Sequence, residues 1–354
     1  MVANKKATSE KKAQVVKKES GSATLETSEN NKPSQDAQGF SNGKFPIVGI
    51  GASAGGLSAF EEFFSAISHD KLGMAFVLVQ HMAPDYKSML SDIIRRYTKM
   101  QVYEVTDRMV VKPDNVYVIP PNWDMVIIDG LLNLLEPAEE HGYRLPIDSF
   151  FRSLASDQKE CAIGIVLSGT GSDGTMGVRA IKAEGGMVMA ESPEHSEYNG
   201  MPKSAIDTGL VDYILKPGEM PAKLREYVSH MYEDEFQSSP STEEAMKSIF
   251  HLLLTQTGHD FSQYKHKTID RRIRRRMIVN NIKRIDGYAH YLQQKPEEIE
   301  ALFLDLLIGV TSFFRNSKVF EALQTHAIPT LFNNELVSKP PLYLFPTHHK
   351  TCNI

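Results

Sequence analysis

The sequence of 354 residues has only two cysteines, no long hydrophobic run and no excess of positive charge. Cys161 and Cys352 stand in no disulfide or metal-ligand pattern, which fits a reducing compartment. No apolar stretch approaches membrane-spanning length, and the N-terminus lacks the apolar segment of a secretory signal. A net charge of -5 argues against a nucleic-acid-binding protein. We therefore expect a cytoplasmic protein with no membrane insertion and no nucleic-acid partner.

Three changes of pattern divide the chain. Residues 1–43 have almost no large apolar side chains, which predicts a disordered tail. Across residues 44–232, short apolar runs alternate with segments of helical period, which predicts a doubly wound α/β domain: a mostly parallel sheet with helices on both faces. Residues 233–243 are acidic and then rich in Ser and Pro, as is typical of a linker. From residue 244 to residue 325 the pattern is helical and predicts a small all-α domain.

The first predicted strand, Ile47–Ile50, runs into a turn of small residues centred on Ser53. The spacing Gly-Ala-Ser-Ala-Gly is that of a nucleophile elbow, in which small neighbours let a tight turn project the hydroxyl. Amides at the start of the following helix are suited to hold an oxyanion. Two other interpretations remain open. In the first, the turn is a phosphate-binding loop, although Ala54 stands where the dinucleotide fingerprint needs Gly. In the second, Ser53 is only a helix N-cap.

Two other polar residues follow predicted buried strands. His81 comes after the run Met74–Gln80, and Asp173 lies in the Gly-rich turn after Cys161–Leu167. The carboxyl ends of strands line the ligand crevice of an open α/β sheet, so Ser53, His81 and Asp173 are expected at one site. They are the nucleophile, general base and orienting carboxylate that acyl transfer needs. The structural alternatives are a hydrogen-bonding histidine and an aspartate that forms a turn or caps a helix.

Three motifs, IVGIGASAGG, VLVQHM and LSGTGSDG, resemble the catalytic domain of the CheB-type protein-glutamate methylesterases of bacterial chemotaxis. The resemblance runs roughly from Phe45 to His230 and places the family's catalytic residues at Ser53, His81 and Asp173. It implies hydrolysis of glutamate methyl esters on methylated chemoreceptor-like proteins through an acyl-enzyme, without a cofactor. It also implies deamidation of certain glutamines at the same site.

The sequence departs from this family in two places. Thr170 stands where many members carry Met, which is expected to alter substrate or oxyanion contacts but to leave the triad intact. No receiver domain precedes the esterase motifs, so control by aspartyl phosphorylation within this chain is not expected. The competing interpretation is a non-catalytic signalling scaffold that binds receptor or phosphorelay partners.

The helical region resembles the N-terminal domain of CheR-type chemotaxis methyltransferases, through the motifs TIDRRIRRRM and LLIGVTSFFRN. The resemblance implies that Thr311 and Arg315 form one edge of an S-adenosylmethionine site, here vestigial, and Gly309 departs from the family pattern. The nucleotide-binding sheet of that family does not follow, so we expect no methyltransferase activity. Residues 326–354 fit neither family and are expected to form an atypical tail, from a truncation or a shifted reading frame.

Five arginines between Arg271 and Arg276 flank a narrow apolar stripe of Ile269, Ile273 and Met277. Such a cluster is either an ordinary solvated helix face or, as the resemblance implies, a docking surface for the acidic, glutamate-bearing helices of receptor-like substrates.

Overall fold

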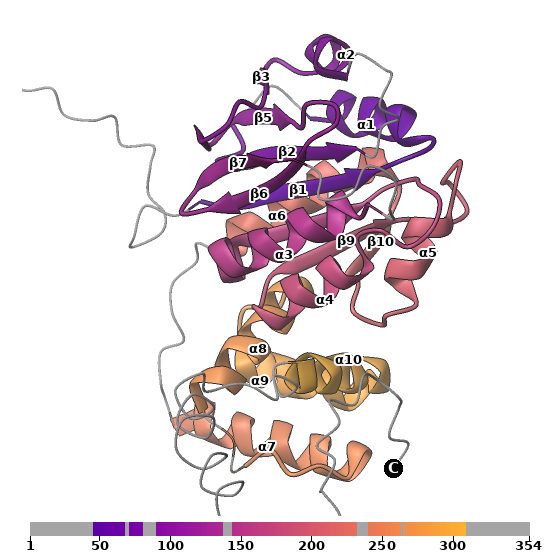
Figure 1. Cartoon of the computed structure of the whole chain (residues 1–354). Helices are drawn as coiled ribbons and strands as arrows, with labels where there is room; N and C mark the ends of the chain where they lie inside the picture. The colour runs from indigo at the N-terminus through magenta and orange to yellow at the C-terminus, as the bar shows by residue number, and fades with distance from the viewer. Residues whose placement is uncertain are drawn as a thin grey trace, which may run out of the picture. The chain divides into compact units, whose positions relative to one another are not determined.

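The computed structural model describes residues 45–67, 71–80, 90–136, 144–231, 240–262, 264 and 266–308. The predicted N-terminal tail, the C-terminal tail and most of the predicted linker fall outside these ranges, as do His81, Thr311 and Arg315. The described residues form an α/β region followed by a helical region (Figure 1).

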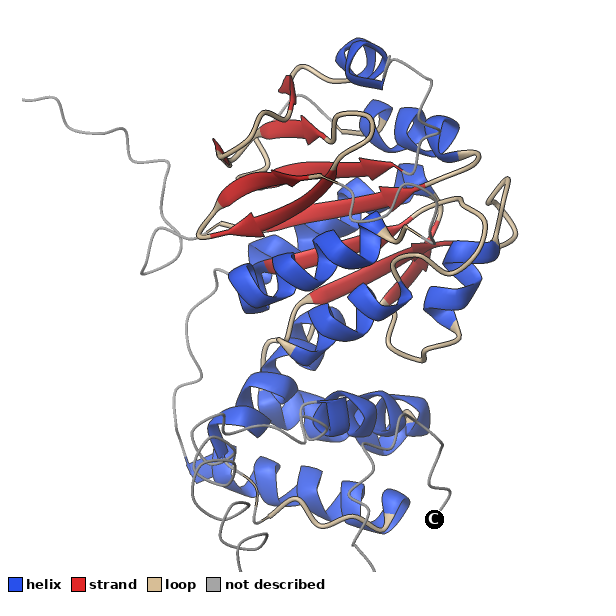
Figure 2. Ribbon diagram, in the orientation of Figure 1, coloured by secondary structure: helices blue, strands red, loops and turns tan. Residues whose placement is uncertain are grey.

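A seven-stranded sheet is the centre of the α/β region, and every strand pair in it is parallel. In spatial order its strands are β10 (Tyr213–Leu215), β9 (Met187–Glu191), β8 (Ala162–Val166), β1 (Ile47–Ala52), β2 (Ala75–Gln80), β5 (Asn115–Val118) and β3 (Gln101–Glu104). All residues of β1 and β8 are buried, because helices cover both faces of the sheet (Figure 2). The predicted α/β class is confirmed.

Two apolar cores lie on opposite faces of this sheet. One contains side chains of α1 (Gly56–Ser65), α2 (Leu90–Tyr97) and α6 (Met220–Met231). The other contains side chains of α3 (Pro146–Gln158), α4 (Thr175–Ala183) and α5 (Gly200–Ile206). Helix α3 approaches β1 closely, since a Cβ added at Gly51 would lie 2.4 Å from Cγ2 of Ile147. Two short 3-10 helices, Lys159–Cys161 and Pro217–Glu219, complete this region.

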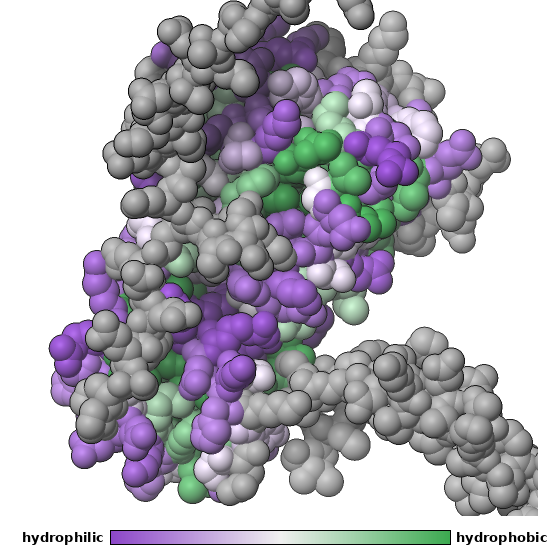
Figure 3. Space-filling model, turned by 90° about the vertical axis from the view of Figure 1, so that its left-hand side faces the viewer, coloured by the Kyte–Doolittle hydropathy of each residue, from purple (hydrophilic) through white to green (hydrophobic). Residues whose placement is uncertain are grey.

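A three-stranded antiparallel sheet of β4 (Met109–Val110), β7 (Leu131–Leu135) and β6 (Asp124–Ile128) accompanies the main sheet. The dipeptide Asp129-Gly130 is a hairpin-turn signal in the sequence, and here it joins β6 to β7. Both residues have positive φ, as a tight two-residue hairpin turn requires. Several large apolar side chains of the α/β region are exposed, among them Ile128 and Leu135. Figure 3 shows a face on which apolar residues are grouped within polar surroundings.

Up to residue 308, where the described part of the chain ends, the helical region contains four helices: α7 (Pro240–Thr257), α8 (His266–Val279), α9 (Ile285–Gln294) and α10 (Pro296–Leu307). They share an apolar core, and the stripe of Ile269, Ile273 and Met277 is buried in it as expected. Helix α7 begins at Pro240, within the last four residues of the predicted linker, and proline is well suited to a first helical turn. None of the described helices is long and apolar enough to cross a membrane.

Both interpretations of the arginine cluster are wrong for three of its members. Arg272, Arg275 and Arg276 are buried, and the Arg272 side chain is only 2% exposed. Their partners are acidic groups and backbone carbonyls, many of them in the α/β region. A local sequence pattern does not reveal such partners, because they are distant in the chain.

Candidate active site

Ser53 lies in the turn between β1 and α1. Its backbone N–H donates to the Ser168 carbonyl over 2.9 Å, and its own carbonyl accepts from Gly56 over 3.0 Å. The N-cap of α1 is Gly55, with φ of 74°, so the alternative that Ser53 is merely the N-cap is wrong. The Ser53 hydroxyl donates no hydrogen bond to any described residue, and the residue is partly exposed. Both properties suit a nucleophile.

The Gly-rich turn after β8 lies directly against the Ser53 turn. A Cβ added at Gly169 would lie 3.0 Å from the Cβ of Ser53 and 2.1 Å from the sulfur of the buried Met201. A methyl group at this position would therefore require the Met201 side chain to move and would press on Ser53. The two turns therefore form one compact surface.

Ser168 ties three segments of this surface together. Its hydroxyl donates to the Ala54 carbonyl over 2.9 Å and accepts from the Tyr198 amide over 2.9 Å. Its backbone N–H donates to the Glu191 carboxylate over 2.8 Å. Burial raises the pKa of Glu191, against the lowering effect of the Ser168 amide. Neither residue was predicted from the sequence, although a carboxylate at the end of the buried run MVMAE was a usable signal.

Asp173 is buried, only 5% exposed, and holds the N-terminus of α3. Its carboxylate accepts from the amides of Ile147 (3.1 Å) and Asp148 (2.9 Å), and also from Gly174 (2.9 Å). Burial and, to a smaller extent, the charge of Asp148 raise the pKa of Asp173 against the lowering effect of the three amides, and the resulting pKa is about 6. Asp173 therefore does cap a helix, as the structural alternative expected, but the helix is α3 and not the α4 that follows it in the chain. These hydrogen bonds fix the position of the carboxylate.

Asp148, in the first turn of α3, binds the N-terminus of α4, the helix that follows Asp173. Its carboxylate accepts from the Gly177 amide over 2.7 Å, in the first turn of α4. Helices α3 and α4 therefore each receive a carboxylate from the other at their electropositive ends. Burial raises the pKa of Asp148 as well. The sequence offered only one hint of this role, an acidic residue in the first turn of a predicted helix.

The strand register brings the predicted site residues to one edge of the sheet. Ala52, just before Ser53, is paired with Gln80, the last residue of β2, and β8 flanks β1 on its other side. The order of strands reverses between β1 and β8, which is where open α/β sheets bind ligands. The turns that carry Ser53 and Asp173 thus meet at this switch point. His81 follows Gln80 in the chain but lies outside the described residues.

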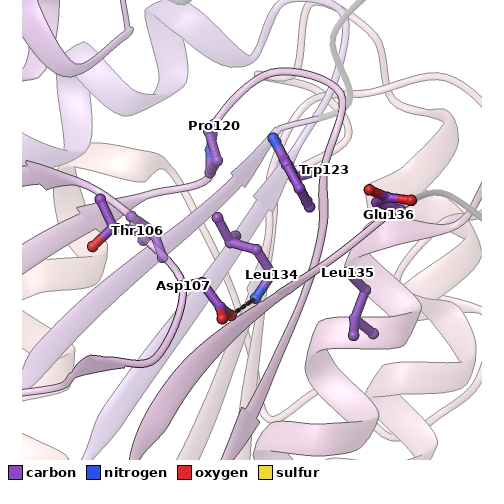
Figure 4. A pocket seen from close by; sticks show the side chains of 8 residues that line it. Thr106, Asp107, Pro120, Trp123, Leu134, Leu135 and Glu136 are labelled. Atoms are coloured by element: carbon purple, nitrogen blue, oxygen red, sulfur yellow. Dashed lines mark hydrogen bonds between the residues drawn. The ribbon is translucent and has the colours of Figure 1, made fainter.

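A pocket of about 600 Å³ opens farther along the same edge, beyond the carboxyl ends of β5 and β3 (Figure 4). Its lining residues are Val105, Thr106, Asp107, Pro120, Trp123, Leu134, Leu135 and Glu136. Trp123 and Pro120 also line a smaller pocket that includes Gln80 and Arg144. The described residues contain no cluster of His, Cys, Asp or Glu that would hold a metal ion.

A parallel sheet with helices on both faces and a strand-order switch point places the protein in the class of open α/β proteins, which bind their ligands at that edge. The chain belongs to the CheB methylesterase family, whose model matches residues 48–224, half of the chain. A second model, the all-alpha domain of CheR methyltransferases, matches residues 244–307. The resemblances noted in both halves of the sequence are confirmed.

Three curated relatives illustrate the similarity. The chain is 33% identical over 267 residues to an uncharacterised 104.1 kDa protein of Rhodobacter capsulatus, covering 68% of this chain and 28% of that protein. It is 34% identical over 170 residues to a protein-glutamate methylesterase/protein-glutamine glutaminase of Rhizobium meliloti, covering 48% of each. It is 31% identical over 176 residues to one of Trichodesmium erythraeum, covering 49% of this chain and 50% of that protein. The chain thus spans half or less of the length of these relatives.

Among solved structures, the chain is similar to the CheB methylesterase catalytic domain of Thermotoga maritima. The two are 31% identical, with a TM-score of 0.48, and the match covers 52% of this chain and 100% of that one.

Proposed function

We propose that the protein hydrolyses glutamate methyl esters on chemoreceptor-like proteins, with Ser53 as nucleophile, His81 as general base and Asp173 as the orienting carboxylate. The observation that carries the proposal is the packing of the Ser53 turn against the Gly169 turn at the switch point of the sheet. The names of two relatives, protein-glutamate methylesterase/protein-glutamine glutaminase, support the same chemistry.

In the first half of the reaction His81 accepts the proton of the Ser53 hydroxyl while the oxygen attacks the ester carbonyl carbon. The carbonyl oxygen becomes an oxyanion, which needs preorganised N–H donors. The backbone amides of Ala54 and Gly55 donate to no acceptor among the described residues, so we assign them to this role. The tetrahedral intermediate then expels methanol, which takes its proton from His81.

In the second half, water attacks the acyl-enzyme, His81 accepts its proton, and Ser53 leaves with that proton as the glutamate γ-carboxylate is released. With glutamine as substrate the leaving group is ammonia instead of methanol. The Asp173 carboxylate keeps the imidazole in the correct tautomer and stabilises its cation. Its pKa of about 6 leaves it mostly ionised at neutral pH.

The decisive experiment is a methanol-release assay on methylated receptor fragments, combined with labelling by a serine-reactive phosphonate. We expect methanol release and one covalent adduct, mapped to Ser53. Ser58→Ala is the matched control, because this exposed hydroxyl lies five residues away and, among the described residues, donates to the Gly55 carbonyl alone. A wild-type protein that binds receptor fragments but forms no adduct would favour the scaffold alternative.

A further inference from the structure

The turn between α4 and β9 is held by arginines of the helical region. The guanidinium of Arg272 donates to the carbonyl of Lys182 over 2.5 Å and also to that of Ala183, at the C-terminal end of α4. Arg275 donates from Nε to the Gly186 carbonyl over 2.8 Å, just before β9 begins. Cations at a helix C-terminus satisfy carbonyls that have no partner within the helix.

Buried ion pairs fix these arginines in place. Asp212 of the α/β region and Asp305 of α10 each pair with Arg275 and with Lys182, and the Lys182 contacts are 2.8 and 3.0 Å. Arg276 adds contacts with Asp212 (3.3 Å) and with Glu298, to which its Nε donates over 2.8 Å. Asp212 also accepts from the amide of Val188, in β9 itself. The α4–β9 turn is therefore clamped by backbone and side-chain contacts together.

The two elements that leave this turn both end in the candidate active site. The N-terminus of α4 follows Asp173 and Gly174 directly and receives the Asp148 carboxylate. The far end of β9 is Glu191, which holds the amide of Ser168 beside the Ser53 turn. Helix α4 has nine residues and β9 has five, so each is short, regular and packed in the core. A displacement at the clamped turn would be carried along both elements to the site.

We propose that Arg272 and Arg275 are positioning residues of the esterase, which hold the α4–β9 turn so that Asp173 and Glu191 keep the geometry of the active site. This inference rests on the proposed function. According to this proposal, the CheR-like helices contribute to the esterase reaction indirectly, because they stabilise the elements that end at the candidate active site.

Arg272→Gln is the primary test, because Arg272 bonds carbonyl oxygens and its loss leaves no buried carboxylate without a cation. We expect kcat for methanol release to fall by roughly 10-fold to 100-fold, as small misplacements of catalytic groups do, with KM unchanged. The pH midpoint of the phosphonate-labelling rate is expected to shift, because the surroundings of Asp173 change. Arg284→Gln is the matched control, since Arg284 forms an exposed pair with Asp286 within the helical region.

Hydrogen exchange provides a second measurement. Faster exchange at the amides of Ile147 and Asp148, far from the substitution in sequence, is expected for Arg272→Gln and not for the control. If Arg272→Gln does not fold, Arg272→Lys replaces it. The lysine keeps the charge but lacks the rigid planar fork with which the guanidinium holds both carbonyls, so a several-fold loss of kcat is expected. A folded variant with wild-type kcat, pH midpoint and exchange overturns the positioning role. Absence of labelling in the wild type would instead refute the proposed function itself.

Discussion

The buried site around Asp173 raises the pKa of its carboxyl group. Desolvation and the neighbouring Asp148 carboxylate favour its protonated form, while three backbone amides favour the charged form. The result is a carboxylate that is fixed in position yet easily protonated compared with an ordinary aspartate in water, whose pKa is 3.8. Such a perturbed acid beside a serine turn is typical of an active site.

The raised pKa of Asp173 has a direct readout. We expect an infrared band of a protonated carboxylic acid that appears as the pH falls through about 6 and is absent from Asp173→Asn. Because the folded-state pKa lies above the unfolded one, this proton stabilises the fold fully below the unfolded value, and the contribution is lost as the pH rises through about 6. The wild type should therefore lose stability relative to Asp173→Asn over that interval in chemical denaturation. A band that titrates at the pKa of an ordinary aspartate would contradict the assignment.

Ser53→Ala is expected to abolish esterase turnover and leave the melting temperature nearly unchanged. Removing the nucleophile of a triad leaves only about 10³–10⁴-fold catalysis over water, from binding and the oxyanion hole. His81→Gln is expected to be about as damaging, and the double variant no worse than either single one, because the members of a catalytic triad act as a unit. Steady-state methanol release measures all three. Losses that multiply in the double variant would show that Ser53 and His81 work independently.

At the scale of elements, the site depends on how closely two turns approach each other. A side chain at Gly169 would contact Ser53 and would fit only if Met201 moved. The steric constraint on position 169 therefore arises from the contact between the Gly169 turn and the Ser53 turn, and not from the conformation of either turn by itself.

Gly169→Ala should lower kcat strongly, because the new methyl group pushes the Ser53 turn or Met201 aside, and overpacking should cost about 1–3 kcal/mol of stability. Gly130→Ala is the control: it strains a positive φ in a remote hairpin turn, where a Cβ would meet nothing within 4 Å. Denaturant unfolding and methanol release are measured on both. Equal losses of activity would show that the effect is one of stability alone.

Local patterns predicted the main elements well and their tertiary partners poorly. The apolar runs located the strands that carry the site, and the Asp129–Gly130 turn located the hairpin. The two-residue strand β4 and the short helix α5 were missed, since neither is long enough to show a period. Ser53 and Asp173 could be predicted as site residues because each follows a buried strand, and their catalytic roles stay predictions. Ser168 was missed because its role depends on hydrogen bonds to segments far away in the sequence.

At the scale of the whole molecule, the pH response should have two parts of opposite sign. Asp212 and Asp305 are buried, which alone would raise the pKa of each, but Arg275 and Lys182 lower the pKa of both carboxyl groups below the usual range. A depressed folded-state pKa contributes stability above the unfolded value, and that stability is lost as the pH falls through the folded one. The effect of Asp173 has the reverse direction.

Asp305→Asn tests this network. Breaking a buried ion-pair network on one side is expected to cost about 3–5 kcal/mol at neutral pH, because Arg275 and Lys182 lose a counter-charge. The difference between the wild type and the variant should shrink below about pH 4, where the wild-type carboxylate begins to lose its advantage. Asp286→Asn, in an exposed pair, is the control. Melting temperatures across the acid range decide, and a difference that is constant with pH would refute the role of Asp305.

The contact between α8 and the α4–β9 turn is made largely of paired charges, and each side carries charges of both signs. Lys182 and Asp212 bond each other within the α/β region, while Arg276 and Glu298 bond each other within the helices. If recombination separated the two coding segments, each product would expose groups that water solvates readily and that retain a counter-ion. Apolar side chains would also come into contact with water, because Val279 belongs to one core of the α/β region and Leu304 and Ile308 pack against the other. Separated products would therefore be charged and still carry apolar patches, so each would tend to associate again with the other.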